Sequence, residues 1–578
     1  MKNSEADIVI TNATVWTGDA AGSWTHAVAI RGDSVVALGT EAEALAGSGA
    51  QVIDADGGMV TPGFQDAHIH PAFAARDMQQ LWLNDTEPSK EAYLEQIRQY
   101  AADNPEADWI TGGGWAMEAF PGGTPHKADL DAIVPDRPVF IMNRDVHGAW
   151  ANSKALEIAG IDNDTPDPSD GRYERDPETG ELTGCLHEGA AYTFKETIVP
   201  LAGIEDWKAA ILTAQKHLHA LGITGWQDAW VSPDTLEAYR QLGESGLLTA
   251  RVVGALWWER KQGLEQIERF VRQRDEGAAP NFLPQRVKIM ADGVLENYTG
   301  ALLEPYCDGC GGQQREGGRG SGLSYVEPEV LQQAVTELDR LGFGVHMHAI
   351  GDRAVRNCLD AVEAARRANG FSDNVHHIAH VQIVNPDDLP RFRELGVVAN
   401  LQALWACAEP QMTELTLPIL GEQRSEQQFP FGDLHRSGAM LAMGSDWAVS
   451  TANPLPQIEV AVTRVDPDER DAEPFLPEQK LDLATALRAF TGGSAHVNGD
   501  SRGGWLGVGQ RADLAILDRN IFAIQPRIAD AKVTMTIAGG RIVFDANADD
   551  NAADSAPMPG RVPDSASKGH DDVVAISH

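Results

Sequence analysis

The 578-residue sequence has few basic residues and no long apolar run, and each shortage excludes a class of protein. Lysine and arginine total 46 against 85 aspartate and glutamate residues, which gives a formal net charge of −39 at pH 7. That balance argues against nucleic acid or an anionic membrane surface as the partner. No segment approaches the roughly 20 consecutive apolar residues that a membrane-spanning helix requires. We therefore expect neither nucleic acid nor a membrane to be bound.

Cysteine is also scarce, with five residues in the whole chain, which does not fit the disulfide framework of a secreted protein. The N-terminal sequence MKNSEADIVITNATV contains neither the basic stretch nor the long apolar stretch of a secretory signal. Both observations predict a cytoplasmic protein. Cys307 and Cys310 form a single CxxC in CDGCGGQQREGGRGSG, whereas a closed zinc site would need a second pair. We interpret this segment as a loop with two free thiols, and a redox or metal role stays an alternative.

The length of the chain predicts two domains, because one hydrophobic core normally stops growing well below this size. Short segments near both chain ends alternate apolar and polar residues, as half-buried strands do. We expect residues 1–60 and 500–545 to join into one small β-sandwich domain. Residues 546–578 are rich in Ala, Asp, Ser and Pro and are predicted to be a disordered acidic tail.

The middle of the chain, residues 61–499, repeats a rhythm of a short apolar strand followed by a helix. Examples are RPVFIMNRD followed by SKALEIAG, and FGVHMHAIGD followed by RAVRNCLDAVEAARRA. Repeated βα units build a parallel sheet, and this many of them fit a closed barrel better than an open sheet. The predicted fold is therefore α/β, a TIM-like (β/α)₈ barrel with a composite β-sandwich domain built from both chain ends.

Polar residues that end apolar runs are the candidates for chemistry, because barrel enzymes carry their working groups at the C-terminal ends of the strands. His68 and His70 end VTPGFQDAHIH, and a strand places residues i and i+2 on the same face. Alone this pair is a weak signal, since a strand histidine is more often a hydrogen-bonded core residue than a ligand. Further ligand-type groups occupy four later strands: Lys288, then His346 and His348, then His376, His377 and His380, and finally Asp446.

Each of these residues also has an ordinary structural explanation. A buried lysine can extend its amine to solvent, and Asp446 before Trp447 could cap a helix. Five strand ends of one barrel would nevertheless converge on one mouth, and imidazole and carboxylate groups suit Zn²⁺ and related ions. We therefore predict a hydrolytic metal centre in which Asp446 binds metal and accepts a proton from the attacking water. An uncharged or carbamylated Lys288 is reasonable beside two cations.

Eight motifs of this chain resemble the amidohydrolase superfamily and, within it, the YtcJ-like (amidohydrolase 3) branch. They run in family order from about residue 5 to 545: VTPGFQDAHIH, HGAWANSKAL, VKIMADGV, VHMHAIGDRAV, IAHVQIV, AMGSDWAVS, NPLPQIEVAVTR and GVGQRADLAILD. The resemblance implies one or two divalent ions, Zn²⁺ in the first place, and a defined set of metal ligands: His68, His70, Lys288, His348, His380 and Asp446. With two ions Lys288 would be a bridging carboxylated lysine, and with one it would be a plain lysine. His346, His376 and His377 have no ligand counterpart and are assigned structural roles.

The branch also implies residues that contact the substrate. His147, in VHGAWANSKAL, matches a strand-end histidine that faces the metal and would polarise a carbonyl oxygen or hold a leaving group. Four more residues are predicted to line the pocket, although ordinary packing explains their aromatic members equally well: Trp115, Asp292, Tyr298 and Trp405. Glu188, in TGCLHEG, carries less information.

The implied reaction is hydrolysis of an amide-type C–N bond by activated water, with Asp446 passing the proton to the leaving nitrogen. Within the branch the chain is similar to the N-substituted formamide deformylases, which release formate and an amine. One alternative is a hydrolase or deaminase of the same superfamily that acts on a cyclic amide, a carbamate or an N-acyl substrate. Another is an inactive relative with a binding or assembly role, although such relatives normally lose ligands. The expected partner is a small-molecule amide, and a homodimer is a candidate assembly.

Overall fold

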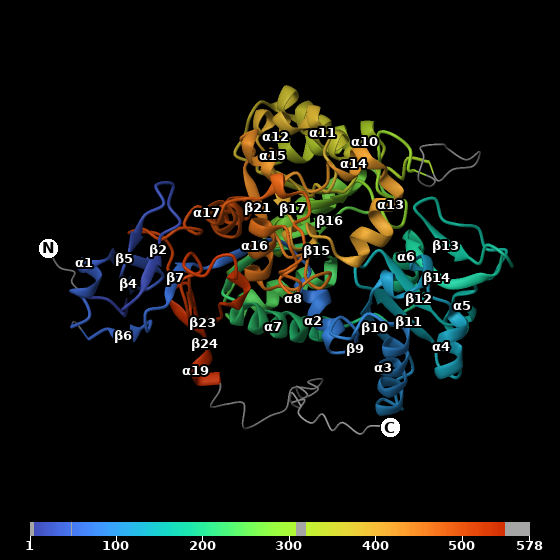
Figure 1. Ribbon diagram of the computed structural model, residues 1–578, viewed down its shortest axis with the longest axis horizontal. Coiled ribbons are helices and arrows are strands. Elements are labelled where there is room, and N and C mark those ends of the chain that lie inside the picture. The colour runs from blue at the N-terminus through green and yellow to red at the C-terminus, as the bar shows by residue number, and fades with distance from the viewer. Residues whose placement is uncertain (1–4, 48, 308–319, 550–578) are drawn as a thin grey trace, which may run out of the picture.

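A parallel barrel forms the centre of the computed structural model, which describes residues 5–47, 49–307 and 320–549 (Figure 1). Its eight strands are neighbours in chain order: β8 (Phe64–Ile69), β15 (Ile223–Val231), β16 (Arg251–Trp257), β17 (Phe282–Met290), β18 (Gly344–Ala349), β19 (His376–His380), β20 (Val397–Leu401) and β21 (Leu441–Met443). Backbone hydrogen bonds join the first strand to the segment after the last one. The amide of Asp446 donates to the His68 carbonyl at 2.8 Å, and the amide of His70 donates to the Trp447 carbonyl at 2.9 Å. The predicted TIM-like barrel is confirmed.

Helices follow the barrel strands and cover the outside of the barrel. The principal ones are α7 (Ile204–Ala220), α8 (Pro233–Glu244), α9 (Ile267–Gly277), α10 (Pro328–Arg340), α11 (Asp352–Asn369) and α12 (Leu389–Leu395). Helix α10 shows why they form there. Leu331, Ala334, Val335 and Leu338 recur at the spacing of one helical face, and all four are buried. Among the described residues, no helix is long and apolar enough to cross a bilayer.

A second sheet, inserted between β8 and β15, lies beside the barrel at the right of Figure 1. Its strands are, in spatial order, β13 (Gly171–Arg175), β14 (Leu182–Glu188), β12 (Gly148–Ala151), β11 (Val139–Asn143), β10 (Ile110–Trp115) and β9 (Leu81–Trp82). The prediction that RPVFIMNRD and SKALEIAG form a barrel unit is therefore wrong. Strand β11 pairs with β12 in antiparallel fashion, and α5 (Ser153–Ala159) follows β12. An apolar run predicts a strand, but it does not predict which sheet the strand joins.

The two chain ends build the small β domain at the left of Figure 1. Its sheets have the orders β5-β4-β1-β6 and β24-β23-β22-β7-β2-β3. The strands are β1 (Ile8–Thr11), β2 (Thr14–Trp16), β3 (Trp24–Thr25), β4 (Val28–Arg31), β5 (Ser34–Leu38), β6 (Gln51–Asp54), β7 (Met59–Pro62), β22 (Leu514–Leu517), β23 (Val533–Ala538) and β24 (Arg541–Asp545). Strands β7 and β22 pair across the two ends, with Pro62 opposite Leu514. Ile10 and Val28 of one sheet share a core with Ile516 of the other, so the composite domain is confirmed.

Two predictions about loops and the tail fall partly outside the described residues. The first part of the predicted disordered tail forms a short helix, α19 (Ala546–Asp549), and residues 550–578 lie outside the described part. Cys310 and most of the Gly-rich segment also lie outside it. Cys307 is a free thiol, as are Cys185, Cys358 and Cys407.

A buried carboxylate ties α10 and α11 to the barrel, and its removal is expected to destabilise the fold. Asp339, at the end of α10, is 3% exposed. It accepts hydrogen bonds from these side chains: Arg366, Asn369, Ser372, Asn374 and His376. Burial alone would raise the pKa of this carboxyl, but the bonds from His376 and the asparagines hold the pKa well below its usual range.

Asp339→Ala is expected to lower the free energy of unfolding by about 3–5 kcal/mol, because Arg366 stays buried without its partner. Glu337→Ala is the control, since Glu337 forms an exposed pair with Arg340 in the same helix and should change stability by less than about 1 kcal/mol. Urea unfolding of both variants gives the comparison. The wild-type contribution is fully present above the unfolded-state pKa of about 4 and is lost as the pH falls toward the depressed folded-state pKa. Equal losses for the two variants would contradict this account.

Candidate metal centre and catalytic cavity

The six predicted metal ligands and His147 line one small cavity of about 60 Å³. His68, His70, Lys288, His348, His380 and Asp446 come from the C-terminal ends of β8, β17, β18, β19 and β21. Parallel strands bring their carboxyl ends to the same mouth, so residues far apart in sequence become neighbours. The structure thus brings all seven side chains together. The ligand role of the first six and the catalytic role of His147 stay predictions.

His68, His70 and Asp446 form the tightest group in this cavity. The Nε2 atoms of His68 and His70 lie 3.2 and 3.1 Å from Oδ1 of Asp446. Potential ligand atoms of the three residues all lie within 4.8 Å of one another. Nδ1 of His380 lies 4.0 Å from the other oxygen of Asp446. Asp446 (φ 53°) and His380 (φ 80°) both have left-handed backbone conformations, which cost free energy in non-glycine residues and cluster at functional sites.

The chemistry of these donors fits a divalent metal ion. Burial, followed by the nearby Lys288, lowers the pKa of His68 to about 3, so its imidazole is neutral and has a free lone pair. Nδ1 of His70, Nδ1 of His380 and Oδ1 of Asp446 are buried and have no hydrogen-bond partner among the described residues. Buried polar atoms without partners are rare and costly. A cation bound to neutral imidazoles and a carboxylate would satisfy them.

Lys288 faces the same cavity from β17 and is 2% exposed. Its Nζ atom forms no hydrogen bond or ion pair with any described residue. Burial lowers the pKa of this amine to about 7. A large share of the amine is therefore neutral near pH 7, which is the form that can act as a nucleophile.

His147 reaches the cavity from the loop between β11 and β12, so the inserted sheet and not the barrel supplies it. Its Nδ1 atom lies 3.0 Å from both carboxylate oxygens of Glu188. Burial opposes charge on both groups, but their mutual attraction raises the pKa of His147 and holds the pKa of Glu188 at about 2. Thr299 donates a further hydrogen bond to Glu188 at 2.9 Å. The pair leaves Nε2 of His147 free to act as a donor. Glu188 carried little information in the sequence, because no local pattern relates it to His147, which precedes the neighbouring strand of a sheet that was not predicted.

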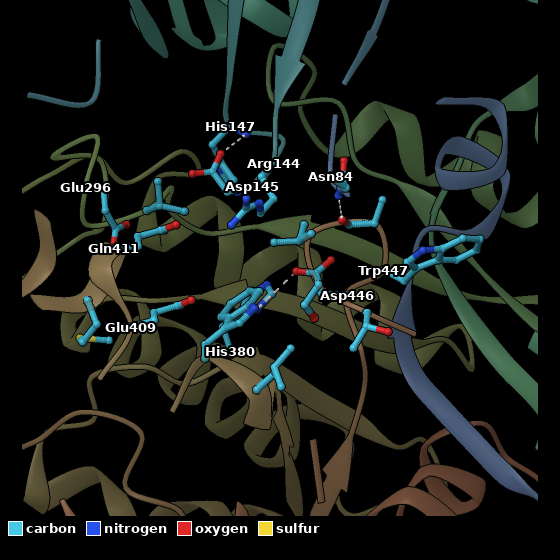
Figure 2. A pocket seen from close by; sticks show the side chains of 18 of the residues that line it. Asn84, Arg144, Asp145, His147, Glu296, His380, Glu409, Gln411, Asp446 and Trp447 are labelled. Atoms are coloured by element: carbon cyan, nitrogen blue, oxygen red, sulfur yellow. Dashed lines mark hydrogen bonds and ion pairs between the residues drawn. The ribbon is translucent and has the colours of Figure 1, made fainter. Parts of the chain in front are cut away.

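A larger cavity of about 540 Å³ adjoins the small one and shares His147, His348, His380 and Asp446 with it (Figure 2). Its lining is acidic: Asp85, Asp145, Glu296, Glu409 and Asp468 are opposed by one arginine, Arg144. Arg144 lies 3.3 Å from Glu118 and is therefore already paired. Burial raises the pKa of Glu409 to about 7. The five acidic lining residues and Arg144 belong to none of the motifs considered in the sequence analysis, so the sequence did not predict them.

The family model described as the amidohydrolase family matches residues 51–544 of the chain. The chain belongs to the amidohydrolase family. This membership, together with the His68, His70 and Asp446 donor group, makes it a metal-dependent hydrolase that acts on carbon–nitrogen bonds.

Several known proteins resemble this amidohydrolase over most of its length. The protein LONG AFTER FAR-RED 3 of Arabidopsis thaliana is 28% identical and covers 93% of this chain and 92% of its own length. The N-substituted formamide deformylase of Arthrobacter pascens is also 28% identical, over 89% of this chain and 94% of its own. The crystal structure of an uncharacterized metal-dependent hydrolase from Pyrococcus horikoshii is 26% identical with a TM-score of 0.69, and it covers 90% of this chain and 99% of that one.

Of the other predicted substrate contacts in this amidohydrolase, Trp405 lines the larger cavity. Its ring stacks on His380 with the ring centroids 5.3 Å apart and the planes 11° apart. Trp405 therefore forms an apolar wall directly beside a predicted ligand.

Three residues predicted to line the pocket line neither of these two cavities: Trp115, Asp292 and Tyr298. The structure places them elsewhere. Trp115 is buried in the core of the inserted region and donates from Nε1 to the Ile141 carbonyl at 2.9 Å. Tyr298 packs against Tyr306, with ring centroids 5.2 Å apart. Asp292 is fully buried, accepts three backbone hydrogen bonds and lies 3.5 Å from Nε2 of His348, so it anchors the loops behind that histidine.

Proposed function

We propose that this amidohydrolase cleaves the amide bond of a small neutral or cationic substrate, in the first place an N-substituted formamide, to formate and an amine. One observation carries the proposal. Neutral imidazoles, a buried amine and a carboxylate converge on one cavity beside a larger chamber that can hold the substrate. The relation to the formamide deformylase of Arthrobacter pascens supports this choice of substrate.

His68, His70, His348, His380 and Asp446 would hold one or two ions, of which Zn²⁺ suits these donors best. When bound, such an ion would acidify a water molecule and polarise a carbonyl group. The carboxylate of Asp446 would accept the proton that the attacking water releases and return it to the leaving nitrogen as the C–N bond breaks.

His147 would donate a hydrogen bond to the carbonyl oxygen, where negative charge develops. Its Nδ1 is held by Glu188, so the ring is oriented and Nε2 faces the cavity. The raised pKa of His147 favours the doubly protonated ring, in which Nε2 carries a proton. A donor placed in advance at this position stabilises the transition state more than the ground state.

Lys288 would add carboxylate-type ligand atoms as its carbamate. The neutral amine attacks carbon dioxide, a C–N bond forms, and one proton leaves to give the carbamate anion. The lowered pKa of about 7 favours this reaction, as does the lack of a hydrogen-bond or ion-pair partner for Nζ among the described residues. The carbamate would extend the donor set from β17, on the side of the cavity opposite β21.

The acidic chamber favours a substrate without a carboxylate. Glu296 and Glu409 lie on one side of His380, and Asp145 lies beside His147 (Figure 2). Arg144 is the one arginine among the lining residues and is paired with Glu118, so little positive charge is available to an anion. The raised pKa values of Glu409, Glu296 and Asp145, caused first by burial, show that negative charge is disfavoured in this cavity, and a substrate carboxylate would meet the same penalty. An N-acyl amino acid is therefore a poorer candidate than a neutral formamide.

The zinc-loaded protein is expected to hydrolyse N-benzylformamide with release of formate. Its kcat/KM for the para-carboxy derivative of the same compound should be at least about tenfold lower, because the added carboxylate meets the acidic chamber. Hydantoin and N-acetylphenylalanine complete the comparison. Release of formate or acetate with an amine reports cleavage of the linear amides, and formation of N-carbamoylglycine reports opening of the hydantoin ring. Turnover of hydantoin or the N-acyl amino acid, with no turnover of any formamide, would reject the proposed substrate and favour the corresponding alternative.

A further inference from the structure

A chain of buried polar side chains runs from His68 through the interior of the barrel to its opposite end. Nδ1 of His68 lies 2.7 Å from Nε2 of His346, and Nδ1 of His346 lies 3.0 Å from Oε1 of Gln227. Nε2 of His377 lies 3.1 Å from the same Gln227 oxygen. Gln227, His346 and His377 are completely buried. The interior of a β/α barrel is usually filled by branched apolar residues, so this polar column requires an explanation.

The direction of these hydrogen bonds is fixed from the far end of the chain. Asp500, paired with Arg511, has only acceptor oxygens, so Gln65 must present its amide Nε2 to it, at 3.0 Å. Oε1 of Gln65 then accepts from Nδ2 of Asn498 at 3.1 Å. Oδ1 of Asn498 in turn accepts from Nε2 of Gln227 at 3.3 Å. Gln227 is therefore left with its carbonyl oxygen facing the two histidines, and both must donate to it.

A second anchor gives the same direction independently. Nδ2 of Asn400 donates to the carbonyl oxygen of Ala67 at 2.9 Å, so this atom is an amide nitrogen. The same group lies 3.2 Å from Nδ1 of His377, which must therefore accept. A neutral imidazole has one donor and one acceptor nitrogen, so Nε2 of His377 carries the proton and donates to Gln227. Two acceptor-only groups at opposite ends of the network, the Asp500 carboxylate and the Ala67 carbonyl, thus agree on Gln227.

We infer that Gln227 and His346 are positioning residues that lock His68 in the tautomer with its proton on Nδ1. His346 donates from Nδ1 to Gln227, so its Nε2 must accept, and the donor to that atom is Nδ1–H of His68. Nε2 of His68 then has no proton and points its lone pair at Asp446 and the candidate metal site. This inference rests on the proposed metal-binding function for its purpose, although the hydrogen-bond chain that carries it, from Gln227 through His346 to Nδ1 of His68, contains no ion. Both rings are completely buried, and burial disfavours a charged imidazole, so each ring carries one proton as the chain requires.

Removing the Gln227 acceptor should release this lock. Gln227→Met keeps the length of the side chain but removes the acceptor for Nδ1–H of His346. The His346 tautomer with its proton on Nε2 then becomes similarly stable. His346 could then donate from Nε2 to Nδ1 of His68, which would move the single N–H proton of the His68 ring to Nε2, at the metal site. Changes to groups that orient metal-binding histidines typically weaken metal affinity by about 10- to 100-fold. We expect a loss of this size in the affinity for Zn²⁺, measured by competition with a chromophoric chelator.

Gln215→Met is the matched control. Gln215, on α7 outside the barrel, also accepts two hydrogen bonds through Oε1, from the amides of Thr249 and Ala250, and donates one through Nε2 to the Leu247 carbonyl. The Gln215→Met variant should lose about as much stability as Gln227→Met but keep the wild-type affinity for Zn²⁺. Gln227→Glu is the rescue variant, since a buried neutral glutamic acid offers the same carbonyl acceptor and an O–H donor toward Asn498. It should restore most of the affinity. Equal affinities of the Gln227→Met and wild-type proteins, or equal losses in both methionine variants, would overturn the inference.

A direct measurement on the wild-type protein covers the case in which Gln227→Met does not fold. Metal-free protein with ¹⁵N-labelled histidine rings is expected to show His68, assigned through the His68→Gln spectrum, as the Nδ1–H tautomer with Nε2 unprotonated. The opposite tautomer would refute the inference. A wild-type protein that binds no Zn²⁺ but shows the expected tautomer would instead reject the proposed metal-dependent function and leave the hydrogen-bond chain intact.

Discussion

Hydrolysis by Asp446→Asn is expected to be at least about 1,000-fold slower than hydrolysis by the wild-type protein. Asparagine keeps the shape of the side chain, but it cannot accept the proton of the attacking water, a contribution that is worth about 10²- to 10⁴-fold. It also removes the negative charge that faces Nε2 of both His68 and His70 at 3.2 and 3.1 Å. Both effects reduce catalysis, and the second also weakens zinc binding. The measurements are kcat/KM for N-benzylformamide and zinc content by elemental analysis.

Asp513→Asn serves as the control for this substitution. Asp513 is a buried aspartate of the small β domain that accepts a hydrogen bond from the Gly539 amide at 2.6 Å. Burial raises its pKa to about 7 even though Arg511 lies 3.5 Å from its carboxylate, and Asp513 lines neither cavity, so the uncharged asparagine should leave hydrolysis unchanged. Zinc content separates the two roles of Asp446. Normal zinc with lost turnover identifies proton transfer, and lost zinc identifies ligation. Undiminished hydrolysis in Asp446→Asn would reject the mechanism.

The sequence predicted the barrel and its metal-binding candidates because both depend on local patterns. An apolar run predicts a strand, and a polar residue that ends the run must lie at the barrel mouth, whichever helix follows. His68, His348, His380 and Asp446 were found in this way, and the structure places them around one cavity. Lys288 was identified as a candidate simply because it is a lysine within an apolar strand. None of these predictions required knowledge of which strands are neighbours.

Pairings across elements are what the sequence did not reveal. Glu188 contacts His147 only because β12 and β14 pair in the inserted sheet, where Gly148 lies opposite His187. Trp115 ends a strand of that sheet and not a strand of the barrel, so it is buried in a separate core. Interior polar residues such as Gln227 had no signal of their own, since the role of a glutamine in an apolar strand is not apparent until its partners on two other strands, His346 and His377, are known. The histidine pair at positions 346 and 348 was the one available hint, because it repeats the i, i+2 spacing of His68 and His70.

The second large effect is expected at Lys288. Lys288→Met keeps a flexible apolar stem in β17 and removes the amine, so no carbamate can form. If the carbamate supplies ligand atoms to a second ion, zinc content should fall from two ions to one per chain, and hydrolysis should fall by at least about 100-fold. Incubation of the wild-type protein with ¹³C-labelled bicarbonate should give a carbamate carbon signal that is missing in the variant. Lys127→Met is the control, because the Lys127 ammonium donates to the Leu182 carbonyl at 2.6 Å and lies outside both cavities.

The outcomes at Lys288 distinguish two forms of the centre that the present geometry allows. His68, His70 and Asp446 already form a compact donor group without help from β17, so one ion could bind in Lys288→Met. His348 and His380, whose rings lie 4.4 Å apart, offer too few donors for a second ion unless a further ligand joins them. Lys288 lines the same cavity as this pair and is the remaining candidate. A wild-type protein with one zinc ion and no carbamate signal would show that Lys288 acts as a free amine, and its pKa of about 7 would then make it a candidate acid or base in the reaction.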